Sequence, residues 1–263
     1  MSVDSKLLKD FLGTKRWAKL LDALKEQTQT APEPLLPTHA ILIALVVSIT
    51  PIAATILNQI QPSNIDLASI TFGVCTLLAI ILRKRFGLIY KSTLNFKESL
   101  SLAHTAFALG CIPTVIILAL NPDVFADRHD ILTSFIPSSE KTQVWTTFDL
   151  VKSIFFLVVV VLWVAVTEEF LFRGLLISTL RRWRLLKKQI HRDIVAGILS
   201  AVLFGAAHYP TWGLLPAIAL SGLGLGFVIA YLADGERLMP IIIYHACFDG
   251  LSLLATILIS TTT

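Results

Sequence analysis

The chain alternates between long apolar segments and short polar ones, and this pattern predicts helices that cross a membrane. A spanning helix needs about 20 mostly apolar residues. The sequence offers seven candidate segments, at roughly residues 39–57, 65–82, 100–120, 150–172, 194–209, 213–233 and 238–259. We therefore expect an all-α fold, a polytopic membrane helix bundle of about seven transmembrane helices.

Residues 1–30 have a different pattern, which predicts an N-terminal amphipathic helix. Leucine, phenylalanine and tryptophan recur near helical spacing, with lysine and arginine between them, until three prolines follow at 32, 34 and 37. A helix of this kind can lie on the membrane surface. It can equally pack on the cytoplasmic loops, and the sequence leaves both alternatives open.

The composition excludes a soluble protein of this length. Apolar residues make up 55% of the 263 residues, and charged residues only 15%, whereas a soluble domain carries about 25% charge. The net charge is only +4, and the charges lie in clumps without the basic face that a nucleic-acid binder needs. We expect the lipid bilayer, and no nucleic acid, as a partner.

The distribution of basic residues predicts an orientation. Of the 22 Lys and Arg residues, 18 lie in residues 1–38 and in the loops at 83–99, 181–193 and 234–237, and two lie in the loops between. The positive-inside rule then places the N-terminus in the cytoplasm and the C-terminus outside, in an integral protein of the bacterial inner (plasma) membrane. We interpret the basic loops as orienting the chain and contacting anionic lipid, with no catalytic role.

Ionisable residues within membrane spans are costly, so each is a functional candidate. The last four spans hold Glu168, Glu169, Arg173, His208, His245 and Asp249. Glu169 and Arg173 are four residues apart, which favours an ion pair on a helix. Glu168 points about 100° away from Glu169 on a helix of 3.6 residues per turn, so it can face a cavity.

These residue types suit the attack of water on a carbonyl group. A Glu or His can act as general base, and an imidazole N–H can bind the oxyanion. Glu168, His208 and His245 could equally hold a divalent metal such as zinc, since two His and a carboxylate form a zinc ligand set. The sequence lacks the His-Glu-x-x-His pattern of ordinary zinc proteases, and it leaves open whether a cofactor is required.

Three patterns occur in order on the late spans: Glu168-Glu169-(x)3-Arg173, Phe204-(x)3-His208 and His245-(x)3-Asp249. Together they resemble the CAAX prenyl endopeptidase (Ras-converting) family, whose prokaryotic members are the CPBP, or Abi, intramembrane proteases. The resemblance covers roughly residues 150–257.

The resemblance implies an intramembrane peptidase whose cavity opens to the cytosol and to lipid, and it implies a role for each residue. Glu168 and His208 would activate water, and His245 and Asp249 would bind the oxyanion or position water. Glu169 and Arg173 would form a supporting ion pair. Asp249 stands where eukaryotic members have Asn, and an ionised Asp cannot donate to an oxyanion.

We therefore predict an endopeptidase that cleaves a membrane-borne or lipid-modified protein or peptide. The alternatives are a proton- or metal-coupled transporter and a noncatalytic scaffold or bacteriocin-immunity protein. The expected organisation is a cytoplasmic arm (1–38), an N-terminal transmembrane region (39–149) and a catalytic core (150–263). Within span six, Gly222-(x)3-Gly226 predicts a close-packing face.

Overall fold

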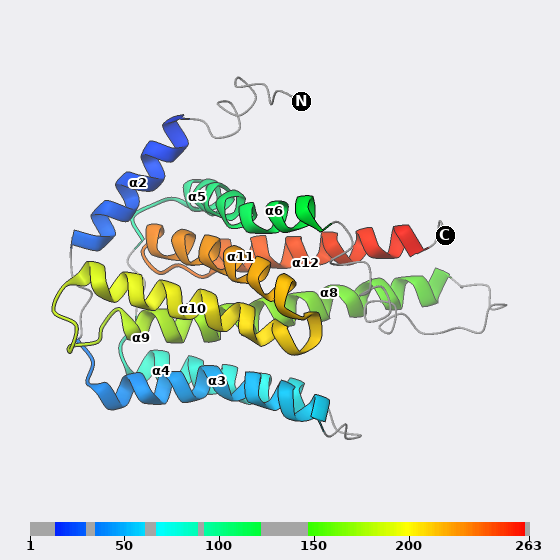
Figure 1. Ribbon diagram of the computed structural model, residues 1–263, viewed down its shortest axis with the longest axis horizontal. Coiled ribbons are helices and arrows are strands. Elements are labelled where there is room, and N and C mark those ends of the chain that lie inside the picture. The colour runs from blue at the N-terminus through cyan, green and yellow to red at the C-terminus, as the bar shows by residue number, and fades with distance from the viewer. Residues whose placement is uncertain (1–13, 30–34, 61–66, 89–91, 122–146, 261–263) are drawn as a thin grey trace.

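The computed structural model describes residues 14–29, 35–60, 67–88, 92–121 and 147–260, and within these ranges it contains helices and no strand (Figure 1). The expected all-α bundle is confirmed. The helices are α2 (Thr14–Gln29), α3 (Thr38–Ile60), α4 (Leu67–Arg85), α5 (Phe96–Gly110), α6 (Ile112–Leu120), α8 (Thr147–Glu169), the π-helix η2 (Phe170–Ile177), α9 (Ser178–Leu180), α10 (Gln189–Trp212), α11 (Leu214–Ala233) and α12 (Met239–Ser260).

Five helical segments in the described residues are long and apolar enough to cross a membrane: Thr38–Ile60, Leu67–Arg85, Phe96–Leu120, Gln189–Trp212 and Leu214–Ala233. The two remaining predicted spans coincide with α8, continued by η2, and with α12. The period and length of the apolar segments therefore located the helices, although several helices extend a few residues beyond the predicted limits.

The third predicted span is not one uninterrupted helix. It consists of α5 and α6, which meet at Cys111, with a proline in the first turn of α6. Because Pro113 has no N–H group, it fits a helix start but not a helix interior. The span predicted at 100–120 is therefore present as Phe96–Leu120, with an interruption at Cys111 that the sequence analysis did not predict. At the other end, Asn95 and Glu98 form a capping box that fixes the start of α5.

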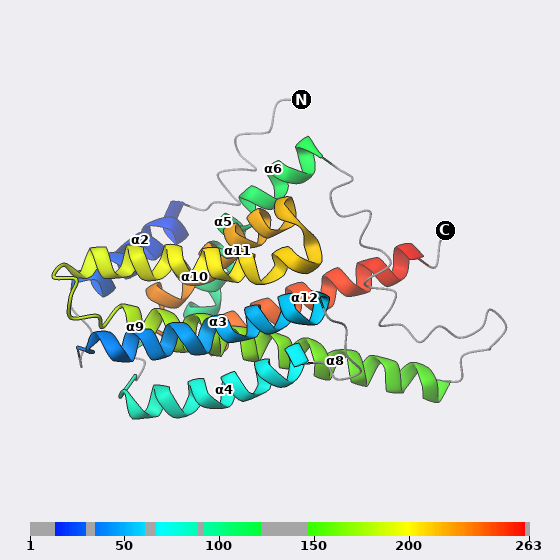
Figure 2. The same ribbon diagram turned by 60° about the horizontal axis from the view of Figure 1, so that its bottom comes forward.

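Consecutive long helices run in alternating directions, so the loop after α9 and the turn between α11 and α12 lie at the same end of the bundle (Figures 1 and 2). Helix α2 also lies at this end, and the C-terminal end of α12 lies at the opposite one. We call the first the basic end, because it holds the loops rich in Lys and Arg. Its assignment to the cytoplasm stays a prediction.

Helix α2 packs on the bundle through its apolar face. Leu20 is buried together with Leu102 of α5 and Ala233 of α11, and Trp17 and Leu24 pack against them. Residues 14–29 therefore pack on helices α5 and α11, where the second alternative expected contact with the loops, and the position of α2 at a membrane surface stays a prediction. Residues 1–13 of the predicted amphipathic helix lie outside the described residues.

Helix α11 is held close to its neighbours by glycines. A Cβ atom on Gly226 would lie 3.0 Å from Cα of Gly110, and one on Gly222 would collide with the ring of Pro113. These contacts with α5 and α6 confirm the predicted close-packing face. On its other side α11 packs against α10, where a Cβ on Gly205 would collide with Ser221. Close packing on both sides fixes the backbone of α11 beside the candidate site.

A buried set of charged residues, the basic-end network, joins α9, α10 and the α11–α12 turn. Arg181 Nε donates to Asp193 Oδ1 over 2.7 Å, and Nη1 groups of Arg181 and Arg182 each donate to Glu236 Oε1 over 2.9 Å. Burial disfavours the charge on Arg181, but the carboxylates of Glu236 and Asp193 outweigh it and raise the pKa of Arg181. Glu236 adopts a positive φ of 72°, a strained conformation for this residue type that these ion pairs hold.

The network corrects the interpretation of the basic loop at 181–193. Arg181, Arg182 and Arg192 are buried, and Arg192 donates to the carbonyl oxygen of Leu186. Half of the six basic residues of this loop therefore bind protein groups and cannot contact lipid. Arg184, Lys187 and Lys188 are exposed, as that interpretation expects.

Candidate active site

The candidate site begins where α8 becomes π-helical. Glu168 and Glu169 are the last two residues of α8, and Arg173 lies in η2. The Arg173 Nη1 group donates to Glu169 Oε1 over 2.9 Å, and both side chains are 0% exposed. Arg173 Nη2 also donates to the carbonyl oxygen of Gly224, and the guanidinium lies 4.5 Å from the ring centre of Phe204. These contacts tie the end of α8 to α10 and α11.

His245 of α12 joins this ion pair to the rest of the site. Its Nδ1 lies 2.8 Å from Glu169 Oε1, the same oxygen that accepts from Arg173. A carboxylate only accepts hydrogen bonds, so Nδ1 carries the proton. The other ring nitrogen, Nε2, then faces Glu168 Oε2 at 3.6 Å and Asp249 Oδ2 at 3.5 Å.

His208 of α10 approaches Glu168 from the other side. Its Nδ1 lies 2.8 Å from the carbonyl oxygen of Phe204. Because a carbonyl oxygen only accepts, Nδ1 of His208 is the donor, and in the neutral ring Nε2 keeps a free lone pair. This Nε2 lies 3.9 Å from Glu168 Oε1. The separations of 3.6 and 3.9 Å exceed a direct hydrogen bond but suit a bridging water.

Exposure increases across the site from one side to the other. The side chains of Glu169 and Arg173 are fully buried, those of His208 and Asp249 are 22% and 30% exposed, and Glu168 and His245 are intermediate between these pairs. All six ionisable residues singled out in the sequence therefore lie in one cluster. Their chemical roles stay predictions.

Two contributors had no role in the sequence interpretation. Gly224 supplies the carbonyl oxygen for Arg173, and a Cβ atom there would lie 3.1 Å from Phe204 Cδ1. The ring of Phe227 lies 5.1 Å from that of His245 and also faces Arg173. Gly224 lies within the glycine stripe of span six, which hinted at close approach, whereas nothing in the sequence distinguished Phe227 from other apolar residues.

The geometry does not form a metal site. Within the described ranges, no group of three or more His, Cys, Asp or Glu side chains is arranged to hold a metal ion.

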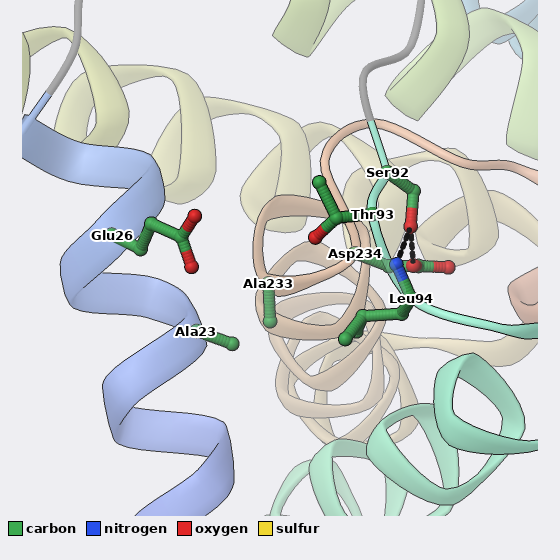
Figure 3. Close-up of a pocket in the computed structure, with 7 residues that line it drawn as sticks. All are labelled: Ala23, Glu26, Ser92, Thr93, Leu94, Ala233 and Asp234. Atoms are coloured by element: carbon green, nitrogen blue, oxygen red, sulfur yellow. Dashed lines mark hydrogen bonds between the residues drawn. The ribbon is translucent and has the colours of Figure 1, made fainter.

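A separate small pocket lies at the basic end, between α2, the segment before α5 and the end of α11 (Figure 3). It is lined by Ala23, Glu26, Ser92, Thr93, Leu94, Ala233 and Asp234. Asp234 Oδ1 accepts hydrogen bonds from Ser92 and Ser99, yet burial raises the pKa of the Asp234 carboxyl. None of the six clustered residues lines this pocket, and we assign it no function.

Comparison with protein families identifies one relationship. Residues 150–251 match the family described as type II CAAX prenyl endopeptidase Rce1-like. The matched segment contains all six clustered residues, and the match supports the function of an intramembrane endopeptidase, a hydrolase with membrane-associated protein substrates. Helices α2 to α6 precede the segment that matches the Rce1-like family. No curated protein and no solved structure matches the chain.

Proposed function

We propose that this chain is a prokaryotic CAAX-processing (CPBP, or Abi) type endopeptidase that uses Glu168 and His208 to activate water. The observation that carries the proposal is the position of Glu168, whose two carboxylate oxygens face Nε2 of His208 and Nε2 of His245 at 3.9 and 3.6 Å. The match of residues 150–251 to the Rce1-like family supports the same reaction class.

Water is activated between Glu168 and His208. The Nε2 lone pair of His208 and a carboxylate oxygen of Glu168 both accept protons, and a water molecule bonded to both loses one as its oxygen adds to the carbonyl carbon. The base that received this proton returns it to the leaving nitrogen as the carbon–nitrogen bond breaks. One proton thus moves from water to the amine product, and the site is regenerated.

His245 and Asp249 act on the opposite side of the carbonyl group. Because Nδ1 of His245 donates to Glu169, Nε2 can donate to an oxyanion only when the ring is an imidazolium. The carboxylates of Glu168 and Asp249 lie 3.6 and 3.5 Å from this nitrogen and offset its charge. Asp249 then orients His245 or a water molecule, a role that an ionised carboxylate can perform.

Glu169 and Arg173 support this arrangement without contacting the substrate. They are completely buried and hold His245 from behind, through the bond between its Nδ1 and Glu169. Substrate approaches from the side of His208 and Asp249, the two partly exposed members of the cluster. We place this side within the bilayer of a bacterial inner membrane, with the basic end in the cytoplasm.

The experiment compares purified wild-type protein with Glu168→Gln and His208→Ala in lipid nanodiscs. The probe is a quenched fluorogenic peptide that ends in a farnesylated cysteine followed by three residues, the CAAX arrangement. Loss of a general base lowers rates by about 10²–10⁴-fold, so both variants should fall in that range while retaining the wild-type unfolding midpoint. Glu26→Gln, at an exposed residue of α2, is the control and should cleave normally.

Either active-site variant cleaving at the wild-type rate would overturn this mechanism. A wild-type protein that yields no product from this peptide or from membrane proteins of its host would overturn the proposed function. Vesicles that transport protons without releasing a peptide product would instead favour a transporter.

A further inference from the structure

The π-helix η2 is bound by side chains from three other helices. Ser48 Oγ of α3 donates to the carbonyl oxygen of Leu171 over 3.3 Å, and Ser200 Oγ of α10 donates to that of Phe172 over 3.1 Å. We call Ser48, Arg83 and Ser200 the donor collar. Its third member, Arg83 of α4, donates from Nη1 to the carbonyl oxygen of Gly174 over 2.6 Å.

These three bonds lie where the backbone departs from an α-helix. A π-helix is rare and occurs mostly as a short segment within α-helices, often at functional sites. Each carbonyl oxygen has two lone pairs, so it can accept from a side chain in addition to the helical N–H. The donor collar therefore offsets part of the cost of the wider turn.

The form of η2 determines where the neighbouring site residues lie. Arg173 is a member of η2 and lies between two of the carbonyl groups that the collar binds. If the segment tightened to an α-helix, the directions of the side chains after Glu169 would change relative to Glu168. Arg173 would keep its four-residue spacing from Glu169 but would lose its alignment with the carbonyl oxygen of Gly224.

Arg83 is itself fixed in place by buried groups. Its Nη1 group also donates to the hydroxyl of Tyr231 over 3.0 Å, and that hydroxyl lies 2.7 Å from Ser178 Oγ. Ser48, Tyr231 and Ser178 are completely buried. Such a fixed donor specifies a backbone position more sharply than a mobile surface arginine does.

We propose that Ser48 and Arg83 are positioning residues, which keep η2 π-helical and so align Arg173, Glu169 and His245 behind Glu168. Both residues precede the segment that matches the Rce1-like family. The proposal assigns residues of the early spans a part in catalysis, and this part rests on the proposed function.

The first measurement needs no substrate. Hydrogen–deuterium exchange of the peptide covering residues 170–177 is compared in nanodiscs for wild type, Arg83→Met, Arg83→Lys and Ser48→Ala. We expect faster exchange of this peptide in Arg83→Met and Ser48→Ala, with unchanged exchange in α11, and partial recovery in Arg83→Lys, which keeps a cationic donor. Arg85→Met and Thr50→Ala are the controls, because Arg85 is exposed and Thr50 binds only its own helix.

The second measurement is cleavage of the farnesylated peptide. Misplacing a reacting group by about 1 Å costs roughly a hundredfold in rate, so we expect kcat to fall about tenfold or more in Arg83→Met, with KM nearly unchanged. A residue that only stabilised the fold would not lower kcat in protein that remains folded. Lysine at position 83 should restore part of kcat, and the two controls should match wild type.

The outcomes separate the two proposals. Folded Arg83→Met and Ser48→Ala proteins with wild-type exchange and wild-type kcat would overturn the positioning role, even if the chain is a peptidase. Faster exchange in a chain that has no peptidase activity would overturn the proposed function and leave the role of the collar in holding η2 supported. If Arg83→Met does not fold, Ser48→Ala and Arg83→Lys decide the question.

Discussion

Two buried groups of charged residues lie along the same bundle, and they differ in how their carboxylates are paired. In the basic-end network, Asp193 and Glu236 each accept from an arginine over 2.7–2.9 Å. In the cluster at the candidate site only Glu169 has such a partner, and Glu168 faces two histidines at 3.6 and 3.9 Å. The network is buried on all sides, whereas the cluster has two partly exposed members.

We interpret this difference as one between a structural arrangement and an arrangement suited to proton transfer. An arginine never gives up its proton in proteins, so a carboxylate paired with one stays an ion pair. A carboxylate that faces imidazoles at an edge accessible to water can exchange a proton. Burial of a charged residue alone does not identify a candidate active site. The residue type that faces each carboxylate, arginine or histidine, is the more informative feature.

The sharpest test of the comparison changes Glu236 to Gln. Removing one partner of a buried ion pair costs about 3–5 kcal/mol, because Arg181 and Arg182 keep their charges without a carboxylate. We expect the unfolding midpoint of Glu236→Gln to fall strongly in a thermal unfolding experiment in detergent. Glu168→Gln, in the same conditions, should unfold near the wild-type temperature. Equal destabilisation by both changes would contradict the division into structural and reactive groups.

A smaller effect is expected for Gly224→Ala. Its Cβ atom would lie 3.1 Å from Phe204 Cδ1, so the ring, over which the Arg173 guanidinium lies, must shift by a few tenths of an ångström. We expect a several-fold lower kcat. Since alanine favours a helix over glycine by up to about 1 kcal/mol, the stability should change little.

The matched control for this change is Gly250→Ala, on α12. Its Cβ would make an ordinary contact of 4.0 Å with Val161 Cγ1, so cleavage should be unaffected. The measurement is steady-state cleavage of the farnesylated peptide by both variants. If Gly224→Ala and Gly250→Ala have the same kcat, Gly224 has no part in aligning Arg173.

The smallest effect concerns Asp234, beside the basic-end network. Burial raises the pKa of its carboxyl above the ordinary value of 3.8, so the folded protein binds this proton more tightly than the unfolded chain does. The contribution to stability is present below the unfolded pKa and is lost as pH rises through the folded pKa. Asp234→Asn keeps an acceptor oxygen for Ser92 and Ser99 but cannot ionise. The stability of this variant should therefore fall less than that of the wild type as the pH rises. The measurement is the unfolding midpoint of both proteins from about pH 4 to about pH 7, and parallel curves would refute it.

The sequence predicted well those features that follow from the chemistry of a residue type alone. Long apolar segments can only be buried or placed in lipid, and each of the seven predicted segments coincides with helix in the structure, five of them long and apolar enough to cross a membrane. The six ionisable residues of the cluster were costly in those spans, and the structure brings them together. That these six residues lie close together could be predicted from the sequence, but the division between a buried ion pair and a partly exposed edge depends on the three-dimensional structure.

Features that depend on contacts between distant helices were missed. Arg181 and Arg182 look like any other loop cations in the sequence, because a count of charges does not reveal that Glu236 lies between them. No residue pattern predicted η2, because a π-helix is stabilised by tertiary contacts such as those of Ser48 and Arg83. The break at Cys111 had a signal, Pro113, but the apolar segment continued through it.

Glu169 and Arg173 form their ion pair within one continuous helical segment, so they need no other helix to neutralise each other. During synthesis this segment can therefore enter the bilayer with its opposite charges already matched, which lowers the cost of insertion. His245 follows Glu169 by 76 residues and is made only with α12. The order of translation thus delivers this charge-matched segment first, and the cluster at the candidate site is complete only once α12 has been made.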